Sequence, residues 1–255
     1  MSNLHQSQSR IVMMSVLVAA SCLAGSVVAD EQPLRIAIAA SPNQFASLEM
    51  YLEQHYLVQC VRVDASKGGP IPDAAKLRDC DVMLLNHYRT EPTAEQLAEV
   101  RKFFLSGKPV VGARKASHAY QNWLEIDRIV FGVKYGSHFN PSKKKEDLKQ
   151  VLTPRGRTHG LVRDLSLVIP GGGLYKYTEL ADDVEVLIEG GVDGDMMPQT
   201  WQRTVAERGG QRVFYTRYDP DDVNQYPEVR DLLVDALFWA AKRDGHQLRR
   251  TPPGD

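Results

Sequence analysis

Strand-like and helix-like segments alternate through the first half of the chain, and this alternation limits the fold more than any other feature of the sequence. Short segments rich in apolar and β-branched residues occupy 34–40, 58–63, 82–85 and 109–113, and helical patterns separate them. Parallel strands need a crossover connection, which is usually a helix. The alternation therefore predicts a parallel sheet with helices on both faces.

Capping patterns predict where two of these helices begin. Ser41 can accept a hydrogen bond from the first helical amides, and Pro42 suits the first helical position, so a helix is expected to start there. Thr93 and Gln96 have capping-box spacing and open another helix, which Gly107 ends.

The second half of the chain contains more strand-like segments, separated by glycine-rich breaks. Strands are predicted at 148–152, 165–169, 184–188, 200–205 and 212–216. A loop is predicted at 132–138, and an amphipathic helix at 229–241.

The fourth predicted strand runs directly into small and polar residues, a pattern typical of a strand, a sharp turn and a helix. In open α/β sheets, ligands bind beyond the carboxyl ends of the strands, so we expect the functional site at this turn. Arg114 brings a fixed positive charge to it and is predicted to stabilise a carboxylate, phosphate or enediolate oxygen. A salt bridge from Arg114 to Asp or Glu is the alternative.

Histidines are the leading candidates for chemistry, because an imidazole titrates near neutral pH and can act as acid, base or metal ligand. His118 and His138 are the predicted catalytic histidines, and for each the alternative is a histidine bonded to the backbone. Together with His159 they could form a three-histidine cluster that holds a divalent metal such as zinc.

Several other side chains are predicted to bind substrate. Asn86 and Arg89 follow the third strand and should face the same crevice as the turn. Tyr175 and Trp201 could supply aromatic platforms for sugars, although large aromatic residues are more often core residues.

Ser117 directly precedes His118, a pair that could suggest a serine hydrolase. Neighbouring residues at a turn are expected to point apart, and Arg114 takes the position at which such a nucleophile would stand. Ser117 is therefore assigned to substrate binding.

Charge and cysteine content exclude some functions. The 31 Lys and Arg against 32 Asp and Glu give a net charge of −1, so no nucleic-acid partner is expected, and 255 residues suit one compact domain. Cys60 and Cys80 could pair or remain free thiols, and neither has the spacing of a structural zinc site.

The first 29 residues have the pattern of a secretory signal peptide. Arg10 precedes an apolar stretch at 11–24, and small residues precede Asp30. Export to the periplasm or the extracellular space is predicted, with no membrane span in the mature chain. An uncleaved anchor is one alternative, and a lipid anchor at Cys22 is another.

A family resemblance depends on motifs that occur in a fixed order. They lie at 107–112, 117–119, 131–138, 159–161, 174–176, 198–201, 212–216 and 238–241. Together they resemble the ThuA-like family, named for trehalose utilisation, whose fold is similar to the class I glutamine amidotransferase domain. The resemblance implies a ThuA-like domain at 30–245, followed by a flexible tail at 246–255.

The resemblance also implies a fold class and a role. The expected fold is α/β, a flavodoxin-like doubly wound, mainly parallel sheet of the class I glutamine amidotransferase type, with extra β-strands in the C-terminal half. The expected partner is a small-molecule carbohydrate, since ThuA-like proteins are linked to the use of disaccharides and their keto derivatives. A homo-oligomer is compatible with this role.

The sequence departs from these patterns at the corner where an amidotransferase acts. Arg114 stands where the nucleophilic Cys belongs, so glutaminase activity is not expected. A frequent Leu-Gly-His appears as Arg217-Tyr218-Asp219, without the His, and Val133 replaces a glycine. Two hypotheses follow: an exported enzyme acting on a sugar or keto-sugar by histidine acid/base chemistry, with or without a metal, or a non-catalytic carbohydrate-binding or interaction module.

Overall fold

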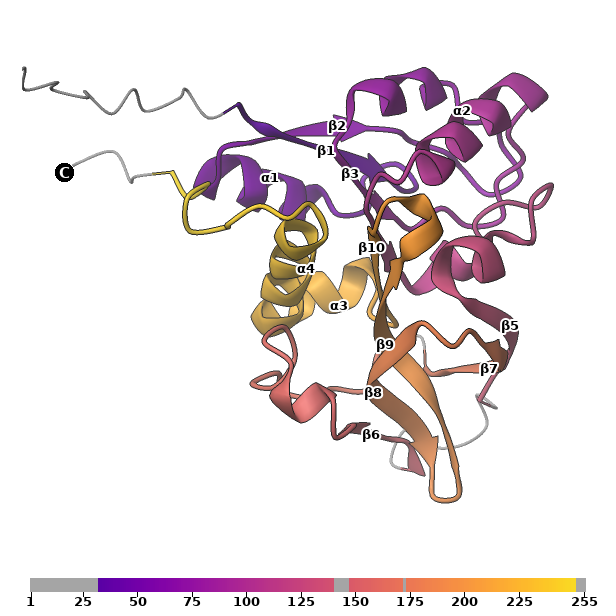
Figure 1. Cartoon of the computed structure of the whole chain (residues 1–255), viewed down its shortest axis with the longest axis vertical. Coiled ribbons are helices and arrows are strands. Elements are labelled where there is room, and N and C mark those ends of the chain that lie inside the picture. Colours follow the sequence, from indigo (N-terminus) through magenta and orange to yellow (C-terminus); the bar gives the residue numbers. More distant parts are fainter. Residues whose placement is uncertain (1–31, 140–146, 172, 251–255) are drawn as a thin grey trace, which may run out of the picture. The chain divides into compact units, whose positions relative to one another are not determined.

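The computed structural model describes residues 32–139, 147–171 and 173–250, and an eight-stranded sheet forms their centre (Figure 1). Five of its strands are parallel and lie in the order β2-β1-β3-β4-β10. Their bounds are β1 (Leu34–Ala39), β2 (Val58–Arg62), β3 (Val82–Leu85), β4 (Val110–Ala113) and β10 (Gln211–Thr216). This is the strand order of flavodoxin-like folds, so the predicted fold class is confirmed.

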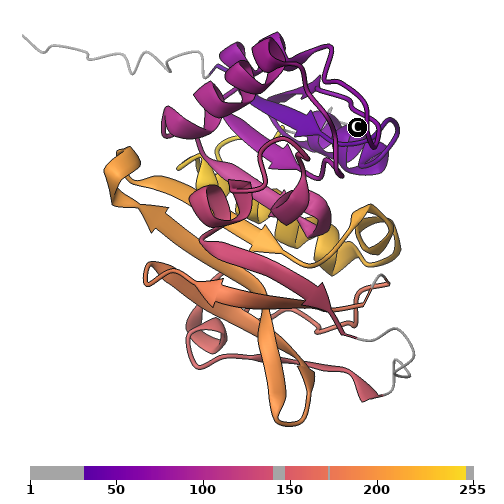
Figure 2. The ribbon, with the colours of Figure 1, turned by 90° about the vertical axis from the view of Figure 1, so that its right-hand side faces the viewer.

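Antiparallel strands extend the sheet beyond β10, as predicted for the C-terminal half. These strands are β9 (Asp195–Val205), β8 (Val184–Val192) and β6 (Lys149–Leu152), in that order. Figure 2 shows the β8–β9 hairpin at the opposite end of the sheet from β1 and β2.

Two strands form a separate antiparallel sheet that the sequence did not predict. They are β5 (Val133–His138) and β7 (Tyr175–Leu180). The range 132–138 had been predicted as a loop, because it lacks apolar alternation. The predicted strand at 165–169 is not formed. This segment is irregular, and its apolar pattern reflects the packing of Leu165 and Leu167 against the core.

Side chains of the central strands alternate between the two faces of the sheet. Leu34, Ile36 and Ile38 pack on the face covered by α1 (Ala46–His55) and α4 (Pro227–Ala240). Ala37 and Ala39 of the same strand pack on the opposite face, which α2 (Ala94–Leu105) and η1 (Ala74–Asp79) cover. Helices therefore lie on both faces, as Figure 1 shows.

The two predicted helix starts have different outcomes. The capping box is confirmed: Gln96 N donates to Thr93 Oγ1 (3.4 Å) and Thr93 N donates to Gln96 Oε1 (3.0 Å). The start at Ser41 and Pro42 is wrong, since α1 begins at Ala46. Its N-cap, Phe45, is left-handed (φ 61°) and buries its ring, so the chain makes a full turn before the helix can start.

The ends of the chain were also the subject of predictions. The predicted signal peptide at 1–29 and the last five residues of the tail lie outside the described residues. Residues 246–250 are held in place: Leu248 is buried, and Arg250 N donates to His55 O (2.8 Å). None of the helices in the described part of the chain has the length and apolar character that crossing a bilayer requires.

Both cysteines of the described chain are free thiols. Cys60 is on β2 and Cys80 directly precedes β3. Because β1 lies between these two strands in the sheet, the fold separates the two sulfur atoms.

The chain turns sharply where β4 ends. Arg114 has a positive φ (21°) and opens η2 (Arg114–His118), a short 3-10 helix. Two residues earlier, a Cβ on Gly112 would lie 2.4 Å from Phe131 Cε1, so only glycine lets this ring pack against the strand. The predicted strand, turn and helix are thus confirmed, and they place η2 beyond the carboxyl end of the parallel strands.

Candidate functional site

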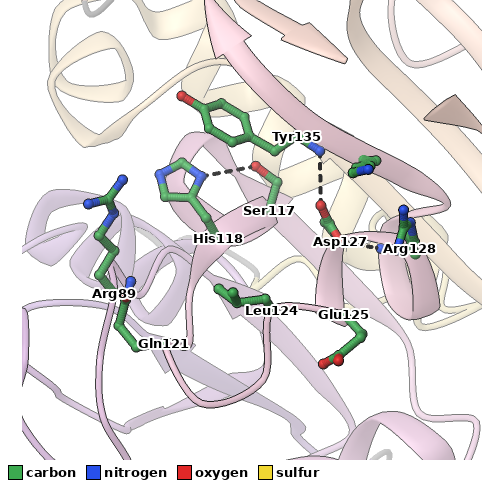
Figure 3. A pocket seen from close by; sticks show the side chains of 10 residues that line it. Arg89, Ser117, His118, Gln121, Leu124, Glu125, Asp127, Arg128 and Tyr135 are labelled. Atoms are coloured by element: carbon green, nitrogen blue, oxygen red, sulfur yellow. Dashed lines mark hydrogen bonds between the residues drawn. The ribbon is translucent and has the colours of Figure 1, made fainter. Parts of the chain in front are cut away.

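A cavity of about 480 Å³ opens beside η2, at the carboxyl end of β4 (Figure 3). Its lining residues are Arg89, Ser117, His118, Gln121, Leu124, Glu125, Asp127, Arg128, Lys134 and Tyr135. The volume is typical of small-molecule sites, and the position is the one at which open α/β sheets bind ligands. Of the predicted site residues, Arg89, Ser117 and His118 line this cavity.

His118 lies among three tyrosines. The centroid of its ring is 4.8 Å from that of Tyr135, 5.5 Å from Tyr88 and 5.6 Å from Tyr175. Its Nδ1 atom lies 3.3 Å from Ser117 Oγ, and the other ring nitrogen lies on the side of Arg89 (Figure 3). One nitrogen of this imidazole is therefore turned toward the cavity.

Its surroundings keep His118 uncharged at neutral pH. Burial is the main cause that lowers the pKa of His118, to about 4. Nearby cations lower this pKa further, namely Arg89, Arg217, Arg114 and Lys115. At pH 7 the imidazole can therefore accept a proton or donate its own N–H, but it carries no charge.

An ion pair occupies the corner where an amidotransferase would hold its nucleophile. Arg114 Nη1 lies 2.6 Å from Asp219 Oδ2, and the two side chains are only 17% and 12% exposed. Asp219 also caps α3 (Pro220–Gln225) by accepting the amides of Asp221 and Asp222. Of the two alternatives for Arg114, the structure shows the salt bridge. The residue at the elbow is thus a paired arginine, which cannot act as a nucleophile.

A second buried guanidinium was missed in the sequence. Arg217 is fully buried, and its Cζ lies 3.8 Å from the ring centroid of Tyr175. Burial is the main cause that lowers the pKa of Arg217, followed by the charge of Arg114. Tyr175 is 6% exposed, and its ring contacts both Arg217 and His118, so it is not the open sugar platform that we predicted.

Trp201 belongs to the core and not to the site. It is completely buried, its ring is stacked on Tyr215 with centroids 4.0 Å apart, and its Nε1 donates to Phe131 O (2.9 Å). The prediction that Trp201 binds substrate is therefore wrong. Its position on β9, in the middle of the sheet, explains the burial.

Asn86 is also buried, but it supports the turn. Its Oδ1 accepts the backbone N–H of Lys115 (3.2 Å), and its Nδ2 donates to Gln44 Oε1 (3.1 Å). The side chain thus joins the end of β3 to the start of η2. Asn86 therefore supports the turn and does not line the cavity.

The three histidines that were predicted to hold a metal do not converge. His138 is an exposed residue at the end of β5, and His159 follows η5 (Gly156–Thr158) beside Gln202 of β9. Neither lines the cavity that contains His118. Across 32–139, 147–171 and 173–250, no three His, Cys, Asp or Glu side chains are grouped to hold a metal ion, so the predicted zinc site is not formed.

Ser117 and His118 do touch, contrary to the expectation that they would point apart. Ser117 is nevertheless a poor nucleophile, because it is 1% exposed.

Asp127 and Tyr135 form a wall of the cavity that sequence reasoning missed. Asp127 Oδ2 accepts the N–H of Tyr135 (2.9 Å), and its Oδ1 accepts the N–H of Arg128 (2.7 Å). Burial raises the pKa of Asp127. The signal in the sequence was an Asp inside an otherwise mostly apolar run at 126–131. Its carboxylate holds the first residues of β5, including Tyr135, in place.

The strand order and the turn after β4 define a flavodoxin-like α/β protein whose elbow lacks a nucleophile. The sequence model of the ThuA family, described as trehalose utilisation, matches residues 38–240. The chain therefore belongs to the ThuA family, as the resemblance implied. None of the curated proteins matched the chain.

Solved structures share the fold at low sequence identity. A ThuA-like protein from Bacteroides uniformis is 17% identical, with a TM-score of 0.59, and 85% of this chain and 95% of that chain are covered. One from Parabacteroides merdae is 13% identical, with a TM-score of 0.52 and coverage of 82% and 90%. The mmIFT52 N-terminal domain is also 13% identical, with a TM-score of 0.50 and coverage of 82% and 98%.

Proposed function

We propose that the protein acts in carbohydrate utilisation, on a sugar or keto-sugar bound in the His118 cavity. The observation that carries the proposal is an uncharged imidazole beside a guanidinium, that of Arg89, in one cavity at the carboxyl end of the sheet. Membership of a family described as trehalose utilisation supports the substrate class.

Proton transfer next to a carbonyl group is the chemistry that these residues fit best. His118 takes the proton from the carbon beside the carbonyl of a keto-sugar, and the C–H electron pair forms the C=C bond of an enediolate. Arg89 stabilises the negative charge on its oxygen. Return of the proton to the opposite face of the same carbon completes an epimerisation. Return to the former carbonyl carbon, with transfer of the hydroxyl proton from one oxygen to the other, completes an isomerisation, and neither route needs a co-reactant.

This mechanism predicts that His118→Gln lowers turnover by a factor of about 100 or more, because general acid/base groups contribute about that much. The measurement is deuterium uptake in D₂O, followed by NMR, with a panel of disaccharides and their 3-keto forms as substrates. His55→Gln, which changes an exposed histidine on α1, is the matched control. Unchanged uptake in His118→Gln, or loss in His138→Gln instead, would contradict the mechanism.

A non-catalytic carbohydrate-binding module is the second candidate. The ion pair between Arg114 and Asp219 favours it. These two residues stand where the family pattern would have a nucleophile and a histidine, and here they form a structural contact instead. Calorimetry that shows saturable sugar binding, together with no deuterium uptake, is the result that this candidate predicts. Any uptake that depends on His118 excludes it.

Export is part of the proposal as well. It is supported by the signal-peptide pattern at 1–29. Expression of the full chain with its own N-terminus is expected to give an exported protein whose sequence begins at Asp30. Retention of the intact N-terminus in the cytoplasm would refute this assignment.

A further inference from the structure

Three cationic side chains gather around one aromatic ring beside His118, and one of them, Arg89, lines the cavity. Lys67 Nζ, Arg89 Cζ and Lys115 Nζ each lie within 5.6 Å of the ring centroid of Tyr88. The ring of Tyr88 meets His118 edge-on, with centroids 5.5 Å apart. We call Lys67, Arg89 and Lys115 the cation cluster.

Nothing in the described chain neutralises the cation cluster. Among residues 32–139, 147–171 and 173–250, no carboxylate lies within 4.0 Å of Lys67, Arg89 or Lys115. Other cations near the cavity differ in this respect, since Arg128 and Lys134 both pair with Glu179. The unpaired positive charge is therefore concentrated around Tyr88, beside His118, where like charges repel one another.

Backbone hydrogen bonds hold the three segments of the cluster together. Gly68 N donates to Arg89 O (2.8 Å), which joins the loop of Lys67 to the end of β3. Arg89 N donates to His118 O (3.3 Å), and Lys115 N donates to Asn86 Oδ1 (3.2 Å), which joins β3 to η2. The backbone segments that carry the three side chains are thus held beside one another.

Arg89 occupies a backbone conformation that favours glycine. Its φ is 47°, in the left-handed region, which costs a residue with a side chain about 1 kcal/mol. Strain of this kind is typical of functional sites, where the surroundings enforce it. Here the strain belongs to the residue whose guanidinium lies beside His118 (Figure 3).

From these contacts we infer that the ligand of this cavity carries an anionic group, a carboxylate or a phosphate, which binds between Lys67, Arg89 and Lys115. The substrate class is then an acidic sugar, either a sugar acid or a sugar phosphate. The inference rests on the proposed function for the sugar part of the ligand. The anion supplies the countercharge that the cluster lacks, and its oxygens accept charge-assisted hydrogen bonds.

Binding of an anion also changes the chemistry of His118. Burial is the main cause that lowers the pKa of His118, and Arg89 and Lys115 of the cluster lower it further. An anion beside Arg89 and Lys115 offsets their charge, so the pKa of the imidazole rises toward its ordinary value. The acidic ligand therefore makes His118 a better base at the moment when it is needed.

Calorimetric titration of the full-length protein tests the charge preference. The probes are D-glucuronate, D-galacturonate, D-glucose 6-phosphate and D-galactose 6-phosphate, each compared with the neutral hexose. At least one acid is expected to bind about tenfold more tightly than its neutral hexose, as one charge-assisted hydrogen bond would give. The uronates and the phosphates separate the two sources of anionic charge.

Charge-removing variants then assign the preference to the cluster. Lys67→Gln and Lys115→Gln are each expected to lower the affinity for the acidic sugar about tenfold and to leave the affinity for the neutral hexose unchanged. Lys102→Gln, which removes an exposed charge from α2, is the control and should change neither value. All three positions are on the surface or partly exposed, so the substitutions are expected to leave the fold intact. Thermal unfolding of each variant checks this.

The outcomes separate this inference from the proposed function. Acids that bind no more tightly than neutral hexoses, or a preference that survives in both variants, would overturn the inference even if neutral keto-sugars are turned over. An acid preference that depends on Lys67 and Lys115 supports the inference. It does so even where no ligand shows deuterium uptake, since only the proposed catalysis then fails.

Discussion

Replacement of Arg114 by methionine is expected to lower the free energy of unfolding by about 3 kcal/mol, because it leaves the carboxylate of Asp219 without its partner in a largely buried corner. Methionine keeps much of the apolar volume of the arginine stem, so the loss reports on charge and not on packing. Urea denaturation, followed by circular dichroism, measures the change.

A double-mutant cycle separates the ion pair from other effects of the substitution. Asp219→Asn removes the negative charge but keeps a side-chain oxygen that can cap α3. The double variant is expected to be more stable than Arg114→Met alone, because neither partner is left buried with an unpaired charge. Additive losses in the two single variants would show that the ion pair does not carry the stability of this corner.

Acidification is expected to destabilise the protein by about 3 kcal/mol through a second buried residue, His87. Its side chain is 1% exposed, and burial lowers its pKa from 6.5 to about 4. Nε2 lies 2.8 Å from the carbonyl oxygen of Val63, so this nitrogen carries the proton, and Nδ1 accepts from the Tyr120 hydroxyl (3.4 Å). Each pKa unit is worth about 1.4 kcal/mol.

The direction of this effect follows from which state binds the proton. Between pH 6.5 and about pH 4, His87 is protonated in the unfolded chain and remains neutral in the folded protein. The stability is therefore full above pH 6.5, falls as the pH decreases through this window, and stops falling near pH 4. His118, whose pKa is also lowered to about 4, acts in the same direction.

Comparison with His87→Gln isolates the contribution of His87. A glutamine can donate to the carbonyl of Val63 and does not titrate. The stability difference between the wild-type protein and this variant is expected to shrink as the pH falls from 6.5 to 4. A difference that stays constant with pH would show that His87 is protonated normally in the folded protein. Urea denaturation at a series of pH values gives these differences.

The sequence predicted the central sheet because local pattern and burial agree there. Strands such as 34–39 are apolar on both faces, which is the signal of a parallel strand covered on both sides. The pair β5 and β7 was missed because its residues alternate irregularly, with register shifts around Tyr135, so no period-two pattern is present. The start of α1 was missed because Phe45 buries its ring from a left-handed conformation, which no capping rule signals.

The site was predicted in part, for reasons that depend on distance along the chain. Arg89, Ser117 and His118 line one cavity, as expected, because they follow strands whose carboxyl ends meet. His159 and Trp201 were predicted at the site but lie elsewhere. Their positions depend on how the antiparallel strands are ordered in the sheet, and periodicity in the sequence does not give that order. Asp219 was interpreted as a missing histidine, whereas the fold brings it to Arg114 across 105 residues.

The two-stranded sheet of β5 and β7 contributes to the cavity wall but is not part of the eight-stranded sheet. Among the described residues, strand β5 pairs only with β7, and it brings Tyr135 to the cavity wall. Changes in β5 can therefore reshape what the cavity accepts without breaking a hydrogen bond of the eight-stranded sheet. Directed evolution of a changed ligand preference would therefore best begin at the cavity-facing residues of β5.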